Sequence, residues 1–149
     1  MQSASETLRS ILEAFIQLTV DWSSVATQSE ITRAAQVDVE VSDLALLYLL
    51  GLSGRQRQGN LANELRQSAP TTSKQVSRLE SLGYVERHID PTDSRAVLVS
   101  LSPEGESAVS RLNAPTEAGI SAALETIPAS DRALFTSHLL TFISALRAQ

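Results

Sequence analysis

Apolar residues recur every three or four positions near both ends of the chain, which is the spacing of amphipathic helices. The first predicted helix covers Ser5 to about Thr27. The last follows Pro128, and between them a helix opening at Ser102-Pro103-Glu104 meets Pro115, where it must kink or restart. The N-terminal stripe consists of Leu8, Ile11, Leu12, Phe15, Ile16, Thr19, Trp22, Val25 and Ala26, and the C-terminal stripe of Leu134, Phe135, His138, Leu139, Phe142, Ile143 and Leu146.

Between these ends the pattern changes to shorter elements. Residues 28–40 are more polar, and Ser42-Asp43 then opens a helix whose span from Leu44 to Leu50 is nearly all apolar and therefore buried. Residues 56–60 form a polar connection with a poorly marked helix start. A short support helix follows, and its inward face consists of Leu61, Ala62 and Leu65.

The best marked helix runs from about Pro70 to Leu82. Ser68 can cap it, and a proline near the first helical position costs no hydrogen bond. Its inward face is predicted to contain Thr72, Val76, Leu79 and Leu82. Its outward face then carries short hydroxyls and two cations, namely Thr71, Ser73, Lys74, Ser77 and Arg78.

A two-stranded hairpin follows this helix directly. Gly83 is typical of a helix end, and residues 84–89 alternate in the manner of a strand. Residues 90–94 form a turn cluster, and residues 95–101 a second strand with Val97, Val99 and Leu101 on one face. The sequence therefore predicts a mainly α fold with a small β wing: a winged helix-turn-helix over residues 42–102.

The residue types on the outward helix face suit double-stranded DNA. Hydroxyls bond base edges or phosphates, and lysine or arginine binds guanine or backbone phosphate. Arg95 lies at the hairpin tip, close enough to Asp93 for the carboxylate to steer the guanidinium, and an arginine on a narrow protrusion suits the minor groove. The alternatives are an ordinary solvated helix face and a weak surface ion pair at the tip. The candidate DNA-binding residues are Thr71, Ser73, Lys74, Ser77, Arg78, Arg87, Asp93, Arg95, Arg57 and Arg66.

The net charge of −5 is segregated along the chain. Seven cations and five anions lie between Arg55 and Arg95, whereas the remaining residues hold five cations and twelve anions. Binding of DNA phosphates depends on the local electrostatic potential and not on the net charge of the protein. The middle of the chain can therefore bind DNA, while the acidic remainder limits non-specific binding to DNA.

The amino-acid composition argues against several other functions. With 149 residues, 42% apolar and 19% charged, the chain fits one globular domain, 1–149. Cysteine is absent, which excludes disulfides and thiol chemistry, and His88 and His138 are too far apart in sequence to favour a zinc site. We expect no cofactor and no catalysis, because no glycine-rich phosphate loop or convincing carboxylate pair is present. Since neither a membrane-spanning run nor a secretion signal is evident, we expect a cytoplasmic protein.

The long helical stripes exceed what the small central module can bury. We expect residues 1–36 and 103–149 to form a dimerisation region in which two copies of the chain pack symmetrically. Bundling within one chain is the alternative. A dimer would place two recognition helices about one turn of DNA apart, so the operator should be a near-palindrome.

Three stretches carry a family resemblance. These are Leu61-Ala62 with Glu64-Leu65, the helix end Arg78 to Arg87, and Asp93-Ser94-Arg95 followed by residues 97–105, with the sequence VLVSLSPEG. Together they resemble the MarR family of bacterial transcription regulators, although this chain has Thr72 and Gln75 where the family usually has aliphatic residues. The resemblance implies a homodimeric DNA-binding regulator, usually a repressor, controlled by a small-molecule effector whose identity the sequence does not reveal. A winged-helix adaptor that binds proteins is the alternative hypothesis, and the outward cations argue against it.

Overall fold

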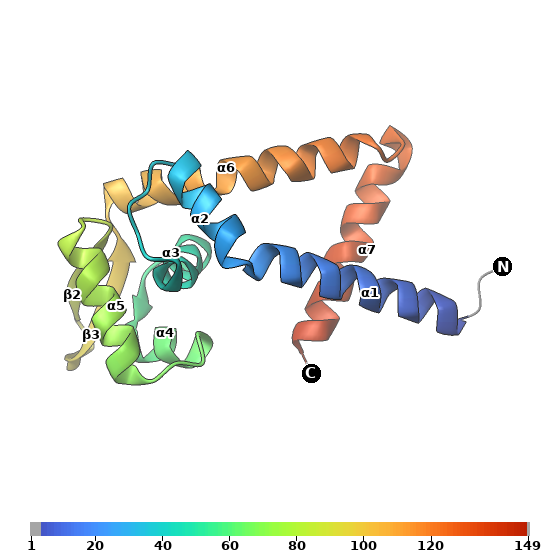
Figure 1. Cartoon of the computed structure of the whole chain (residues 1–149). Coiled ribbons are helices and arrows are strands. Elements are labelled where there is room, and N and C mark those ends of the chain that lie inside the picture. The colour runs from blue at the N-terminus through green and yellow to red at the C-terminus, as the bar shows by residue number, and fades with distance from the viewer. Residues whose placement is uncertain (1–3, 149) are drawn as a thin grey trace. The chain divides into compact units, whose positions relative to one another are not determined.

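The computed structural model describes residues 4–148, and the predicted mainly α fold with a small β wing is confirmed (Figure 1). Two compact units divide the chain, one ending at Leu112 and one beginning at Asn113. Residues 1–3 and 149 of the predicted dimerisation region lie outside the described residues. The elements are α1 (Ala4–Ser23), α2 (Val25–Ala34), α3 (Val41–Ser53), β1 (Gln56–Arg57), α4 (Gln58–Glu64), α5 (Ala69–Ser81), β2 (Val85–Asp90), β3 (Asp93–Leu101), α6 (Pro103–Glu125) and α7 (Ala129–Arg147).

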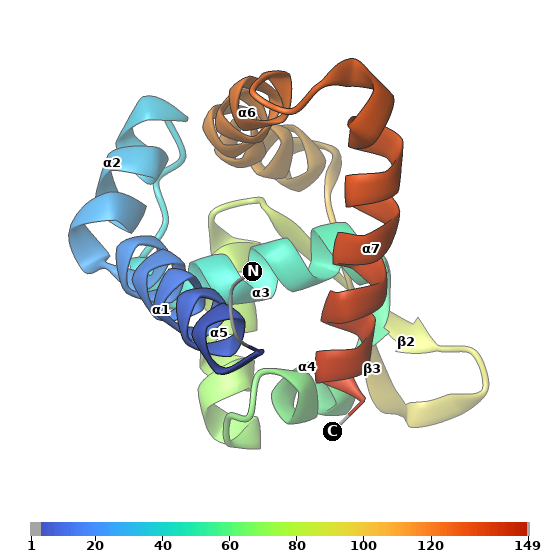
Figure 2. The same cartoon turned by 90° about the vertical axis from the view of Figure 1, so that its right-hand side faces the viewer.

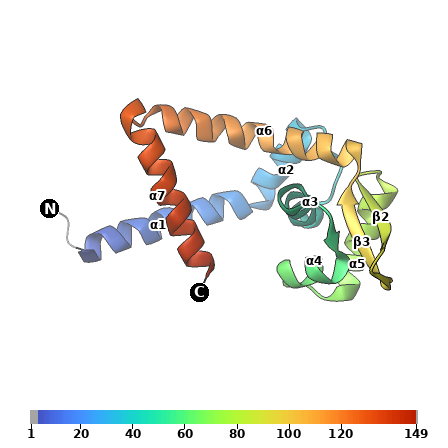
Figure 3. The same ribbon diagram turned by 180° about the vertical axis from the view of Figure 1, so that it is seen from behind.

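The first unit is built around α3, which contacts α2, α5 and β3 (Figures 1 and 3). The predicted burial of this helix is confirmed, since Leu46, Leu47 and Leu50 are almost fully buried. Apolar side chains from the other elements complete one core. They are Leu61 of α4, Val76 and Leu79 of α5, Val85 of β2, Val99 of β3, and Ala108 and Leu112 of α6.

The sheet has the order β1-β3-β2 and is antiparallel throughout. Val85 pairs with Leu101 and Ile89 with Val97, and residues 91–92 connect the two long strands. Figure 2 shows this hairpin as a projecting arm. The predicted wing is therefore confirmed, but the two-residue strand β1 was missed because so short a segment carries no periodic pattern.

The structure confirms the predicted start of α5. The Oγ atom of Ser68 accepts a hydrogen bond from the backbone N–H of Thr71 at 3.3 Å and so caps the helix. Leu82, which was predicted to face inward, is instead 42% exposed. The helix ends at Ser81, so Leu82 no longer follows the periodicity of the inward face, and the buried polar residue Gln75 lies on that face instead.

The predicted N-terminal helix is interrupted. Ser24 has an extended backbone conformation, and α2 begins after it, so the prediction of one helix to Thr27 was wrong. The side chain of Gln28 is buried and donates to the carbonyl of Trp22 at 2.6 Å, which satisfies a group at the broken end of α1. α3 also starts earlier than predicted, at Val41 with Glu40 as its N-cap residue.

The helix α6 passes through Pro115 without restarting, contrary to one of the two predicted outcomes. Its first turn is anchored to the hairpin: the Ser102 hydroxyl donates to the Gly83 carbonyl at 2.5 Å and accepts from the Gly105 N–H at 3.0 Å. A Cβ atom on Gly105 would collide with the carbonyl oxygen of Tyr84. Glycine is therefore required at this close approach of helix and strand.

In the second unit, Arg132 closes the turn between α6 and α7 by donating to the carbonyl oxygens of Ile127 and Glu125, at 2.9 and 3.3 Å. No residue of α7 is buried, and His138 of the C-terminal stripe is exposed in the single chain. Within residues 4–148 no helix is both long and apolar enough to span a membrane.

Candidate nucleic-acid interface

The two faces of α5 separate as predicted for most positions. Thr71, Lys74 and Ser77 are exposed and Ser73 is half-buried, whereas Thr72, Gln75, Val76 and Leu79 are buried on the other side. Lys74 has no hydrogen-bonding or ionic partner among the described residues. This face offers hydroxyl groups and one ammonium group that can bond base edges or phosphates.

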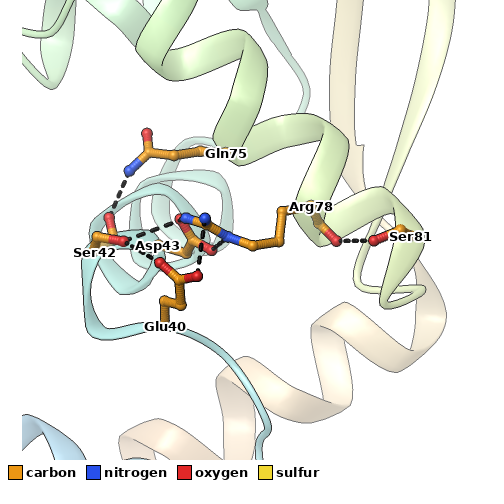
Figure 4. Close-up of polar contacts among 6 residues, drawn as sticks. All are labelled: Glu40, Ser42, Asp43, Gln75, Arg78 and Ser81. Atoms are coloured by element: carbon orange, nitrogen blue, oxygen red, sulfur yellow. Dashed lines mark hydrogen bonds and ion pairs between the residues drawn. The ribbon is translucent and has the colours of Figure 1, made fainter.

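Arg78 does not project freely from α5, as the predicted outward position required. Its Nε donates to Asp43 Oδ2 at 2.6 Å and its Nη2 to Asp43 Oδ1 at 2.5 Å, and Nη1 lies 3.0 Å from Glu40 Oε1 (Figure 4). The hydrogen bond to Asp43 is the main reason that the pKa of Arg78 is raised. The guanidinium is therefore held against the start of α3, which corrects the prediction that it points outward.

Arg87 links the wing to α5. Its Nη1 lies 2.8 Å from Glu80 Oε2, and its Nη2 donates to the Ser77 hydroxyl at 2.9 Å and to the Ser73 carbonyl at 3.3 Å. Because the guanidinium bonds three groups of α5, its first role in the structure is to hold β2 against that helix.

Arg57 links the start of α4 to the turn that joins β2 to β3. It occupies the N-cap position without capping, and its side chain instead donates to Asp90 Oδ2 at 2.7 Å and to the Thr92 hydroxyl at 3.1 Å. The hydroxyl and backbone N–H of Thr92, together with Arg57, lower the pKa of Asp90 to about 2. The sequence placed Asp90 only in a turn cluster, and its role as an anchor was missed.

The remaining candidates lie at loops. Arg95 is exposed at the wing tip, and its guanidinium has no partner within residues 4–148. Asp93 Oδ1 accepts from the backbone N–H of Arg95 at 3.1 Å, so the carboxylate shapes the turn and does not bind the guanidinium as predicted. Arg66, which follows α4, is exposed with a φ of 52° and has no side-chain partner in the same range.

The candidate cations therefore fall into two groups. Lys74, Arg95 and Arg66 are available to a partner, whereas Arg57, Arg78 and Arg87 are each paired with a carboxylate from another element. Sequence reasoning could not separate these groups, because a pairing carboxylate such as Asp43 lies 35 residues away along the chain. No cluster of metal-ligating side chains occurs in the part of the chain that the structure describes.

Comparisons with known proteins agree with this geometry. A family model described as "MarR family" matches residues 37–96. An uncharacterised HTH-type transcriptional regulator of Mycobacterium bovis, Mb0904, is 30% identical over 99 residues, which cover 66% of this chain and 69% of the relative. The regulator ML2140 of Mycobacterium leprae is 36% identical over 73 residues, or 49% of this chain and 51% of the relative.

Solved structures share the fold at low sequence identity. A MarR family protein from Bacillus stearothermophilus has a TM-score of 0.79 and 18% identity, covering 98% of this chain and 99% of its own. Streptococcus pneumoniae FabT in complex with DNA has a TM-score of 0.70 and 15% identity, covering 97% and 98%. At this identity the likeness establishes the winged-helix fold alone.

Proposed function

This chain belongs to the MarR family of transcription regulators and is a DNA-binding regulator, not an enzyme; we propose that it acts as a homodimer on a near-palindromic operator. The observation that carries the proposal is the exposed face of Thr71, Lys74 and Ser77 on α5, together with Arg95 at the wing tip. An unpaired lysine and arginine on adjacent protruding elements are the groups that DNA phosphates and grooves attract.

In the proposed complex the DNA-binding module, residues 42–102, contacts both grooves of the DNA, the major groove with α5 and the minor groove with the wing. The helix α5 lies in the major groove, where Thr71, Ser73, Lys74 and Ser77 contact base edges or phosphates. Arg95 enters the minor groove, and Asp93 sets the backbone turn that presents it. Arg66, which follows α4 in the same module, neutralises a phosphate of the DNA backbone. Arg57, Arg78 and Arg87 contribute to DNA binding chiefly through the contacts that they already make within the protein.

The dimer is supported by the apolar side chains that the terminal helices expose. Leu8, Leu12 and Ile16 of α1 and Leu134, Leu139 and Ile143 of α7 are all exposed in the single chain. Monomeric proteins rarely leave such stripes in water, and a symmetric partner covers a stripe with its own copy. Residues 1–36 and 103–149 therefore form the proposed dimerisation region.

We further propose repression controlled by a small-molecule effector. A ligand changes DNA affinity only when it binds one arrangement of the two recognition helices better than the other. Screening compounds by thermal shift would identify a ligand through the stability it adds. The DNA mobility assay would then show whether the same compound releases DNA, and a binder with no effect on DNA affinity would exclude effector control by that compound.

The central test is a mobility shift with the duplex upstream of the protein's own coding region, against a shuffled duplex of equal length. We expect the wild type to prefer the native duplex and Lys74→Ala and Arg95→Ala to weaken that preference. Equal, weak binding of both duplexes would contradict the operator proposal. It would favour the alternative of a protein-binding adaptor, for which the internal pairing of Arg57, Arg78 and Arg87 is the one supporting observation.

A further inference from the structure

Arg78 of α5 neutralises the buried carboxylate of Asp43 on α3. Asp43 is fully buried, and Arg78 of α5 supplies its only charged partner among the described residues. The arginine side chain is 27% exposed and binds both carboxylate oxygens with Nε and Nη2. A buried charge is tolerated only when it is paired with good geometry, and this two-point fork fixes both distance and orientation.

A second side chain of α5 contacts the same segment of α3. Gln75 Nε2 donates to the backbone carbonyl of Ser42 at 2.6 Å, and Arg78 Nη2 also lies 3.3 Å from the Ser42 hydroxyl. Figure 4 shows Gln75 and Arg78 extending from adjacent turns of α5 toward residues 40–43. Residues three apart lie on one helix face, so the two contacts together resist rotation of α5 about its axis.

The rotation of α5 decides which residues face DNA. Thr71, Lys74 and Ser77 lie at three-residue spacing on the exposed face, and Gln75 and Arg78 lie at its border, four residues beyond Thr71 and Lys74, where they reach the start of α3. Each residue turns a helix by about 100°, so a rotation of a fraction of that angle would move the hydroxyls away from base edges. A group that prevents such rotation therefore influences sequence readout without contacting DNA.

We propose that Asp43 and Arg78 form a positioning clamp that fixes the orientation of α5, and that Arg78 acts on DNA binding through this clamp and does not itself contact DNA. The proposal rests on the proposed function for its DNA readout. The competing account is that Arg78 leaves the carboxylates and binds a phosphate when DNA arrives.

Arginine and lysine distinguish the two accounts. Lysine keeps the positive charge and can bind phosphate, but it cannot reproduce the two-point fork on a carboxylate. The clamp predicts that Arg78→Lys loses sequence preference almost as Arg78→Gln does. The phosphate account predicts that lysine retains affinity, and that glutamine reduces the dependence of log affinity on log salt by about 0.9 for each phosphate that is no longer neutralised.

The experiment measures binding of wild type, Arg78→Lys and Arg78→Gln to a duplex that wild type selects from a random library, and to a scrambled duplex, over a range of salt. We expect both variants to lose roughly tenfold or more in preference, the scale of removing one bidentate base pairing, with an unchanged salt slope on the scrambled duplex. Arg111→Lys is the matched control. Arg111 of α6 also joins separate elements, because it donates to the Ala35 carbonyl after α2 while it pairs with Glu104 of its own helix, and its variant should keep the preference.

Amide hydrogen exchange of the DNA-free proteins tests the clamp separately. In Arg78→Lys and in Asp43→Asn, the amides of α5 should exchange faster relative to those of β3 than they do in wild type. If Arg78→Gln fails to fold, the double variant Asp43→Asn/Arg78→Gln removes the unpaired charge and takes its place.

The outcomes separate the two proposals. A wild type that selects no duplex overturns the proposed operator function, and the exchange measurement then decides the clamp alone. Preference and α5 exchange unchanged in Arg78→Lys would overturn the clamp. A smaller salt slope in Arg78→Gln but not in Arg78→Lys would overturn the claim that Arg78 makes no DNA contact.

Discussion

The helices α5 and α7 are both amphipathic, but their apolar residues have different surroundings. In α5 the inward residues Val76 and Leu79 are completely buried by other elements of the same chain. In α7 no residue is buried, and Leu139 and Ile143 remain exposed. A periodic stripe thus predicts that a helix needs a covering surface, while the origin of that surface depends on the remaining elements. The difference separates a module whose apolar side chains its own chain buries from helices whose apolar side chains the proposed dimer would cover.

The largest expected effect comes from making a cavity beneath α5, the helix whose apolar residues are buried. Leu79→Ala removes a fully buried side chain between α5 and the core, which should lower the free energy of unfolding by about 2–5 kcal/mol. Leu139→Ala is the matched substitution on α7. Its effect in urea unfolding should shrink as protein concentration falls, because dissociated subunits no longer make the contact that the substitution weakens. Equal, concentration-independent losses for the two variants would contradict the contrast.

A second test compares the two ends of one helix. Gly105→Ala places a methyl group against the Tyr84 carbonyl and should destabilise the protein by about 1–3 kcal/mol through overpacking, or more if α6 must shift. Gly119→Ala lies in the same helix with nothing near its Cβ position. That control should be neutral or more stable by up to ~1 kcal/mol, since alanine favours helices. Thermal unfolding measures both, and a stable Gly105→Ala protein would show that the hairpin does not hold α6.

A third change addresses the exposed stripe of α1. Leu12 is 56% exposed within the predicted stripe, and Leu18 is 65% exposed outside it. We expect Leu12→Glu to shift the protein from dimer to monomer in light scattering, because a charge would be buried in the interface. Leu18→Glu should leave the dimer intact, with the circular dichroism of both variants like that of wild type. Dissociation by Leu18→Glu alone would place the interface on the other face of α1.

Local patterns predicted the elements better than their interactions. The cap at Ser68, the helix α5 and the hairpin follow from short-range signals, since capping and alternation depend on neighbouring residues. The break at Ser24 was missed because the apolar stripe continues across it. The two-residue strand β1 exists only because β3 lies beside it.

The candidate site shows the same limit more sharply. Periodicity placed Thr71, Lys74 and Ser77 outward, as the structure does, and it treated Arg78 as one more outward cation. The pairing of Arg78 with Asp43 joins residues that are 35 positions apart, and it depends on how α5 packs on α3. The periodicity of the sequence therefore predicted which face of α5 carries positive charge, but it did not predict which of those charges are paired with carboxylates.

The smallest expected effect concerns Asp90, which lies at the end of β2 in the module whose core its own chain buries. Because the hydrogen bonds from Thr92 and, to a smaller extent, Arg57 lower the pKa of this carboxyl from 3.8 to about 2, its ionised form stabilises the folded state. That stabilisation is fully present above pH 3.8 and is lost as the pH falls toward 2, where the folded protein also takes up the proton. We expect the melting temperature of wild type to fall more steeply than that of Asp90→Asn across this interval. Parallel curves would mean that the bonds of ionised Asp90 to Thr92 and Arg57 do not stabilise the wing.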